Sequence, residues 1–343
     1  MRTHELTPET SYVVDAISPG MMPKDINDLI EKYQLSKRKR HRYCFHQSPE
    51  VDLHDIIICY DSTSYIPPNK HVGRAESLLV IDGEIDFFLF TDNGQVYDYR
   101  RLSTYKSSYP FYLRVPPNTW HGLRAVGTKP CIIKETISGP YDSSSLQWAS
   151  FAPTENDNNN AGHSWYNQVY AKCLEGNIVS PDTEVYEQVT ETVFRSSRQL
   201  VTVSSEQLKP IISAAESSSL RRARLCCHSA PEDKLQEMFI ALSPGVDIEE
   251  SMHLRKDESL TVINGKGRYL FPNEDGSIRL DRDLGSYSDA THAGGSDINF
   301  FTRINRYVPH KILVENSTLL IHEATSGPFL KSDTDYRIKG IQW

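Results

Sequence analysis

The chain has 343 residues and a formal net charge of -8. This length exceeds what one hydrophobic core usually supports, so we expect two domains. The acidic balance argues against a nucleic-acid-binding surface, and no apolar run is long enough to span a membrane. The six cysteines lie mostly in apolar runs and form no CxxC pair, so we expect reduced thiols in a cytoplasmic protein.

The first half of the chain predicts one helix followed by short strands. Apolar residues at helical spacing predict a helix over residues 24–33. Short apolar runs that end at glycine, asparagine or proline turns predict strands at residues 55–60, 77–90, 111–115 and 131–137. Short strands at regular spacing are typical of a sandwich or barrel.

A polar segment, residues 142–185, follows these strands. Its acidic and asparagine-rich stretch at 155–160 predicts a loop tip. Aromatic residues such as Trp148 and Trp165 indicate that the segment packs partly on a barrel. A second helical pattern begins after it, over residues 204–212, with a serine in the capping position.

The second half of the chain repeats the polar motifs of the first. An Arg-x-Arg-x-Cys-x-His sequence begins at Arg40 and recurs 182 residues later at Arg222. A His-x4-Glu-x6-Gly sequence begins at His71 and recurs at the same offset at His253. The chain is therefore a tandem duplication of one domain. We predict a first barrel with its leading helix, a linker and a second barrel with its leading helix at residues 1–141, 142–185 and 186–343.

Three residues of the first half have the types and spacing of metal ligands. Asn69 and His71 share one face of a strand because side chains alternate, and Glu76 follows after a turn. His121 comes from a later strand. Two imidazoles and one carboxylate bind a divalent transition metal (Fe, Zn, Mn or Ni) and leave coordination positions open. The equivalent ligands of the second half are His253, Glu258 and His310.

On these motifs the chain resembles the cupin superfamily, whose fold is the double-stranded β-helix or jelly-roll barrel. Asn69, and Ser251 in the second copy, stand where the cupin motif usually has its first histidine. The Arg-x-Arg-x-Cys-x-His lead, Trp120 and the Glu135-x3-Gly139 sequence narrow the resemblance to WbuC-like cupin-fold metalloproteins. The resemblance implies a bicupin with metal-binding barrels and an association with surface-polysaccharide biosynthesis.

Further polar and aromatic residues are candidates for contacts with a substrate. Arginine suits a carboxylate or phosphate through its planar fork, and alternation places both arginines of a motif on one strand face. A solvated basic run and ordinary core packing are the alternative interpretations of these residues. The candidate substrate-binding residues are Arg40, Arg42, His46, Tyr65, Asn69 and Trp120 in the first copy and Arg222, Arg224 and His228 in the second.

Two classes of function fit these residues. The first is an enzyme in which a metal polarises a small anionic or sugar-type molecule and Glu76 or His121 moves a proton, as in isomerisation or epimerisation. The same ligands suit Fe(II) and oxygen, so a dioxygenase is the alternative enzyme. The second class is a non-catalytic bicupin that binds a small molecule. We expect no nucleic-acid or membrane partner, and either a monomer with an internal pseudo-dimer or a homodimer.

Overall fold

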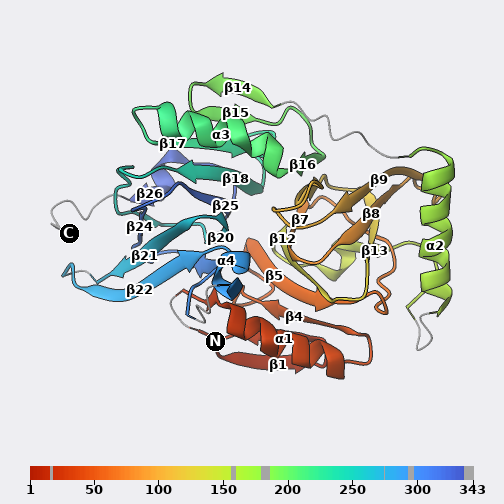
Figure 1. The fold of residues 1–343 in the computed structure, drawn as a ribbon. Coiled ribbons are helices and arrows are strands. Elements are labelled where there is room, and N and C mark those ends of the chain that lie inside the picture. The colour runs from red at the N-terminus through yellow and green to blue at the C-terminus, as the bar shows by residue number, and fades with distance from the viewer. Residues whose placement is uncertain (16–17, 156–159, 179–185, 274, 293–296, 336–343) are drawn as a thin grey trace.

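The computed structural model describes residues 1–15, 18–155, 160–178, 186–273, 275–292 and 297–335. Two β-barrels lie side by side, with the longer helices around them and a short helix, residues 287–292, between them (Figure 1). The expected mainly β fold, with two tandem jelly-roll barrels that each follow a short helix, is confirmed. No helix in the described ranges is long and apolar enough to cross a membrane.

The first barrel consists of a large and a small sheet. The large sheet has the order β1-β2-β4-β5-β12-β7-β10, and the small sheet has the order β13-β6-β11-β8-β9. Their bounds are β1 Thr3–Thr7, β2 Thr10–Val13, β4 Arg40–Cys44, β5 Leu53–Tyr60, β6 Asn69–His71, β7 Glu76–Asp82, β8 Ile85–Phe90, β9 Val96–Leu102, β10 Tyr112–Val115, β11 Trp120–Ala125, β12 Cys131–Ser138 and β13 Leu146–Trp148.

The second barrel repeats this arrangement. Its large sheet has the order β14-β15-β17-β18-β25-β20-β23, and its second layer is divided into β22-β21-β24 and β19-β26. Their bounds are β14 Glu187–Thr190, β15 Val193–Arg195, β17 Arg222–Cys226, β18 Leu235–Leu242, β19 Met252–His253, β20 Glu258–Asn264, β21 Lys266–Pro272, β22 Ile278–Gly285, β23 Phe301–Ile304, β24 Lys311–Leu313, β25 Leu319–Ser326 and β26 Thr334–Asp335.

Two short strands cross from one half of the chain to the other. Strand β3 (Gly20–Met21) pairs with β23 of the second barrel, and β16 (Val201–Val203) pairs with β10 of the first. Each crossing strand directly precedes the helix of its own half. The halves therefore complete each other's large sheets, and the division into domains at residues 141 and 185 stays a prediction.

Two of the helices are those that the sequence predicts. Helix α1 (Pro23–Leu35) begins with Pro23, and helix α3 (Ser205–Ser217) begins with a capping box. In α3 the side chain of Gln207 accepts a hydrogen bond from the backbone N–H of Ser204 at 2.7 Å, which satisfies a donor that the helix leaves free. A short helix, α4 (Tyr287–His292), precedes β23, the strand with which β3 pairs.

Helix α2 (Asn160–Glu175) lies in the segment that the sequence analysis describes as a polar linker. Its buried side chains include Tyr166, Val169 and Cys173, which follow a helical spacing. They pack with Phe88 and Phe90 on the outer face of the small sheet of the first barrel (Figure 1). The expectation that this segment packs on a barrel is therefore correct, but the helix itself was missed. Residues 156–159 of the expected loop tip lie outside the described residues.

The large sheets have two apolar faces, because residues of both parities are buried along their central strands. On β7, Leu78 and Val80 point into the first barrel, whereas Leu79 joins a cluster that contains Phe239 of the second barrel. Alternation along a strand explains this division. One face of each large sheet therefore forms a barrel interior, and the other face forms the contact between the barrels.

A buried charge cluster crosses this contact. Asp55 of the first barrel is fully buried and accepts hydrogen bonds from Arg303 Nη1 at 2.6 Å and Ser259 Oγ at 2.7 Å, both from the second barrel. Lys134 Nζ of the first barrel lies 3.2 Å from the same carboxylate. Burial alone would raise the pKa of Asp55, but the charges of Lys134 and Arg303 hold it below its usual value.

The equivalent residues form a second cluster, in which the carboxylate belongs to the second barrel and the arginine to the first. Glu237 of the second barrel accepts hydrogen bonds from Arg114 Nη1 at 2.6 Å and from Ser77 Oγ, both of the first barrel. His322 Nε2, in the position equivalent to Lys134, lies 3.4 Å from the Glu237 carboxylate. The barrels are therefore joined by a pseudo-twofold pair of buried ionic clusters.

Removing one cation from such a cluster should be costly. Arg303→Met should lower the free energy of unfolding by about 3–5 kcal/mol, because Asp55 would keep a buried charge without one of its two cationic partners. Urea unfolding followed by circular dichroism measures the change.

Arg268→Met is the matched control, since Arg268 forms an ion pair with Asp281 in which the side chains are 40% and 41% exposed. This exposed pair should contribute less than about 1 kcal/mol. Equal and small losses in the two variants would contradict a structural role for the buried cluster.

Candidate metal centres

Strand geometry brings the three expected ligands of the first barrel together. His71 ends β6, Glu76 begins β7, and Gly73 between them has a φ of 70°, which favours glycine in this turn. His121 lies on β11 directly opposite Asn69 of β6. The candidate ligand atoms of His71, Glu76 and His121 all lie within 4.8 Å of one another.

The two imidazoles converge on one carboxylate oxygen. His71 Nε2 lies 3.0 Å and His121 Nε2 lies 3.2 Å from Glu76 Oε2. His121 Nδ1 lies 2.9 Å from the backbone oxygen of Thr119, which fixes the ring and favours a proton on Nδ1, leaving the lone pair of Nε2 for a metal. Burial raises the pKa of Glu76, but the neighbouring charges of His121 and His71 lower it much further, so the carboxylate stays ionised.

Several buried atoms in this cluster lack a hydrogen-bond partner. They include Glu76 Oε2, Asn69 Oδ1 and His71 Nδ1. Buried polar atoms are normally satisfied, so the unpaired Glu76 Oε2, on which the Nε2 atoms of His71 and His121 converge, indicates a cation site. Two imidazole nitrogens and a carboxylate oxygen are the donor set of a divalent transition metal, and the expected cofactor therefore fits these residues.

The second barrel repeats the cluster. The candidate ligand atoms of His253, Glu258 and His310 lie within 4.8 Å of one another. His253 Nε2 lies 2.8 Å from Glu258 Oε2, and His310 Nδ1 lies 2.9 Å from the backbone oxygen of Val308. Burial raises the pKa of Glu258, but the hydrogen bond from His253 and the charge of His310 bring it down to about 2.

The two clusters differ in one aromatic neighbour. Phe87 stacks on His121 in the first barrel, at 5.6 Å between ring centroids. The equivalent Tyr269 lies 5.7 Å from His310 and also donates a hydrogen bond from its hydroxyl to Glu258 Oε1 at 3.2 Å. The hydroxyl of Tyr269 therefore gives Glu258 a hydrogen bond that Phe87 cannot give to Glu76.

A further carboxylate beside each cluster was not among the candidate residues. Glu135 is two strand positions away from the residue that pairs with Glu76, on the same face of β12. Burial and then the charge of Glu76 raise its pKa. The equivalent Glu323 on β25 has its pKa raised to about 7 by burial and then by the charge of Glu258. The signal in the sequence was a glutamate inside an apolar strand, repeated four residues before a Gly-Pro pair.

The arginines of the repeated motif occupy different environments. Arg40 is held by Glu155, with a distance of 2.7 Å between Arg40 Nη1 and Glu155 Oε1. Arg42 is exposed, and its charge lowers the pKa of Glu135. In the second copy Arg222 and Arg224 are both exposed, and the charge of Arg224 likewise lowers the pKa of Glu323.

His46 and His228 are buried near the ends of the barrels. His46 Nδ1 lies 3.3 Å from the backbone oxygen of Asp55, and its ring stacks on His54 at a centroid distance of 4.2 Å. Burial lowers the pKa of His46 to about 3. His228 Nδ1 makes the equivalent contact with the backbone oxygen of Glu237 at 3.0 Å. These contacts support a packing role for both rings.

Tyr65 and Trp120 lie on the outer side of the first barrel. Tyr65 is buried in the cluster beneath α2, and its hydroxyl donates to the backbone oxygen of Pro153 at 2.7 Å. Trp120 Nε1 donates to Asp92 at 3.0 Å. Because side chains alternate along β11, His121 points inward and Trp120 points outward. The structure therefore does not bring these two aromatic residues to the metal centre.

The fold, with two tandem jelly-roll barrels in one chain, is that of a bicupin. The two halves each match the family described as Domain of unknown function (DUF6016), over residues 21–102 and 203–284. No curated protein has significant sequence similarity to the chain.

Solved structures of salicylate 1,2-dioxygenase from Pseudoaminobacter salicylatoxidans share the fold. A variant of that enzyme in complex with gentisate has a TM-score of 0.61 and 13% sequence identity, over 94% of this chain and 87% of the other. Another structure of the enzyme has a TM-score of 0.59 and 13% identity, over 93% and 88% of the two chains. At this identity the similarity shows the two-barrel fold.

Metal content should follow the two clusters separately. Protein purified without chelators should hold about two divalent ions per chain, and His71→Ala and His253→Ala should each lower this to about one, because two remaining ligands bind metal weakly. Elemental analysis measures the content.

His163→Ala on α2 is the control, since His163 contacts the backbone oxygen of Thr63 and the ring of Tyr65 and belongs to neither ligand cluster. It should leave the metal content of the wild type unchanged. If both ligand variants kept the metal content of the wild type, the assignment of the clusters would be contradicted.

Proposed function

We propose that the protein is a metal-dependent enzyme that transfers a proton on a small anionic molecule, as an isomerase or epimerase does. The observation that carries the proposal is the second carboxylate beside each cluster, Glu135 and Glu323, with a raised pKa. A carboxyl group whose pKa is raised can both accept and donate a proton during turnover. Its repetition in both barrels supports a chemical role over chance burial.

The roles of the ligands and of the proton donor are separate in this proposal. When bound by His71, Glu76 and His121, a divalent metal would polarise a carbonyl or hydroxyl oxygen. The low pKa of Glu76 keeps it ionised, which suits a ligand but not an acid. We therefore assign proton transfer to the neighbouring Glu135, and the sequence-based assignment to Glu76 or His121 stays an alternative prediction.

Arg42 supplies the contact for an anionic group of the substrate. Its guanidinium is exposed and donates one hydrogen bond to Thr10 Oγ1 at 3.0 Å. Its remaining N–H groups can bind a carboxylate or phosphate. Arg224 would play this part in the second barrel. A sugar-type substrate and a place in surface-polysaccharide biosynthesis come from the resemblance to WbuC-like proteins alone, and they stay proposals.

An Fe(II)-dependent dioxygenase is the second candidate. Two histidines and one carboxylate with open positions are the ligand set of many non-haem iron oxygenases. The salicylate 1,2-dioxygenase structures support this candidate through their common fold. A bicupin that binds its ligand without catalysis is the third candidate.

Glu135→Gln should separate these candidates. Metal-loaded protein is incubated with sugar acids and nucleotide sugars in D2O, and NMR follows deuterium exchange at carbon. Loss of the acid should slow this exchange by at least about 100-fold while metal content stays unchanged. Oxygen uptake with Fe(II) and aromatic hydroxy acids is measured in parallel.

Glu31→Gln, an exposed change on α1, is the control and should retain wild-type exchange. Undiminished exchange in Glu135→Gln would rule out the proposed proton transfer. Oxygen uptake without deuterium exchange would favour the dioxygenase. The absence of both activities would favour the binding protein.

Arg42→Ala should weaken binding of an anionic ligand by at least about tenfold, because a charge-assisted hydrogen bond contributes roughly 1.5–3 kcal/mol. Calorimetric titration at low and moderate salt measures the affinity. Arg38→Ala is the matched control, since Arg38 belongs to the same basic run and its side chain is 57% exposed. Equal affinities for the wild type and Arg42→Ala would remove the anion contact from the proposal.

A further inference from the structure

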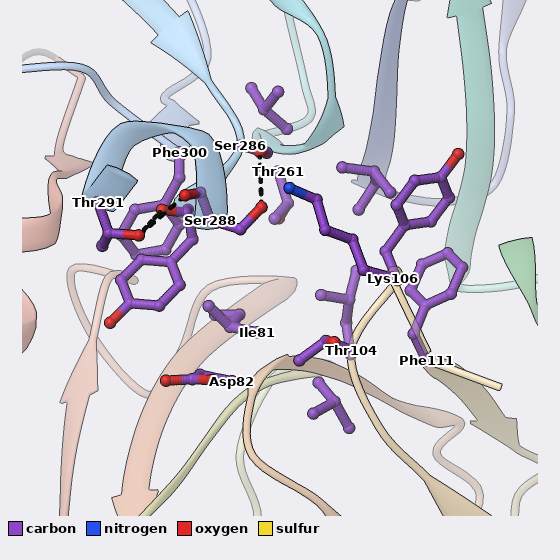
Figure 2. Close-up of a pocket in the computed structure, with 16 residues that line it drawn as sticks. Ile81, Asp82, Thr104, Lys106, Phe111, Thr261, Ser286, Ser288, Thr291 and Phe300 are labelled. Atoms are coloured by element: carbon purple, nitrogen blue, oxygen red, sulfur yellow. Dashed lines mark hydrogen bonds between the residues drawn. The ribbon is translucent and has the colours of Figure 1, made fainter. Parts of the chain in front are cut away.

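A cavity of about 380 Å³ lies between the two barrels. Equivalent residues of the two halves form its walls, including Tyr105 with Tyr287 and Phe111 with Phe300. The cavity therefore lies on the pseudo-twofold axis (Figure 2). It is separate from the metal centres, because Leu79 and Thr261 line it from the faces of β7 and β20 that point away from the barrel interiors.

The two sides of this cavity differ in polarity at one pair of equivalent residues. Leu79 of the first half is replaced by Thr261 in the second. Thr261 is only 2% exposed, and its hydroxyl has no hydrogen-bond partner. An unsatisfied buried hydroxyl costs about 1–3 kcal/mol. A leucine at this position would avoid that cost, so the threonine hydroxyl indicates a bond to a molecule that enters the cavity.

Lys106 brings one positive charge to the same space. Figure 2 shows its side chain extending across the cavity toward Thr261 and α4. Its Nζ lies 3.0 Å from Asp289 of α4. An ammonium group has three donors, so Lys106 can bind Asp289 and a second acceptor at the same time. The equivalent residue in the other half is Ser288, which is uncharged.

We propose that this cavity binds a small carboxylic acid with an apolar or aromatic body. The apolar part would lie between the aromatic walls, with the carboxylate on Lys106 and Thr261. Asp82 also lines the cavity, apart from the Lys106 ammonium (Figure 2), and Asp289 already pairs with Lys106, so the site suits a singly charged carboxylate, whereas a phosphate ester would call for more positive charge. The volume is within the range of about 300–1,000 Å³ typical of ligand pockets, which are apolar with a few convergent polar groups.

The probe is 3-phenylpropanoate, and its neutral amide is the comparison ligand. NMR titrations use the full-length chain dialysed against a chelator, so that binding to a metal cannot contribute. The acid should bind at least about tenfold more tightly than the amide, because only the acid makes a charge-assisted bond with Lys106. Lys106→Met should weaken binding of the acid by at least about tenfold for the same reason.

Two further variants complete the design. Thr261→Leu introduces the residue that the other half carries and fills part of the cavity, so it should abolish binding of both probes. Lys24→Met is the matched control, because Lys24 pairs with Asp297 at 2.6 Å and is 47% exposed, away from the cavity walls. It should bind like the wild type.

Equal affinities in the wild type, Lys106→Met and Thr261→Leu would overturn the proposal, as would no binding by the wild type at millimolar concentration. Thermal unfolding checks that Thr261→Leu is folded. If it is not, Lys106→Met decides alone, since the Lys106 side chain is 57% exposed and its loss leaves the core intact.

Discussion

The two buried charge clusters between the barrels are the constraint on which the rest of the structure depends. Each places a carboxylate of one barrel on an arginine of the other, Asp55 on Arg303 and Glu237 on Arg114. A buried carboxylate is stable only with its partners at close range, so the barrels are held in one relative position. That position also forms the cavity on the pseudo-twofold axis.

Alternation along the strands links these clusters to the metal centres. Glu76 points into the first barrel while its neighbour Ser77 bonds to Glu237 across the contact. On β12, Lys134 belongs to a charge cluster while the adjacent Glu135 lies beside a metal centre. The strands that carry the chemistry on one face therefore hold the barrels together with the other. The halves differ in single side chains, such as Phe87 against Tyr269, and in helix α4, which has no counterpart among the described residues between β9 and β10 of the first half.

The fold and the ligand clusters could be predicted because they depend on local spacing. His71 and Glu76 are separated by one turn, and repetition of the pattern in the second half distinguishes it from chance. The outward direction of Trp120 also follows from alternation with His121, so that expectation could have been corrected from the sequence. Strand exchange by β3 and β16 and the cluster of Asp55 depend on contacts between distant segments, which no local pattern contains. Helix α2 was missed because its apolar stripe lies within a polar segment.

The central claim is that the chain holds the same metal site twice. Anomalous diffraction from crystals of natively purified protein, collected on both sides of the absorption edges of iron, manganese, nickel and zinc, tests it most directly. The account predicts one anomalous peak among His71, Glu76 and His121 and a second among His253, Glu258 and His310. Metal-loaded crystals with no peak at either cluster, or with peaks only elsewhere on the chain, would contradict it.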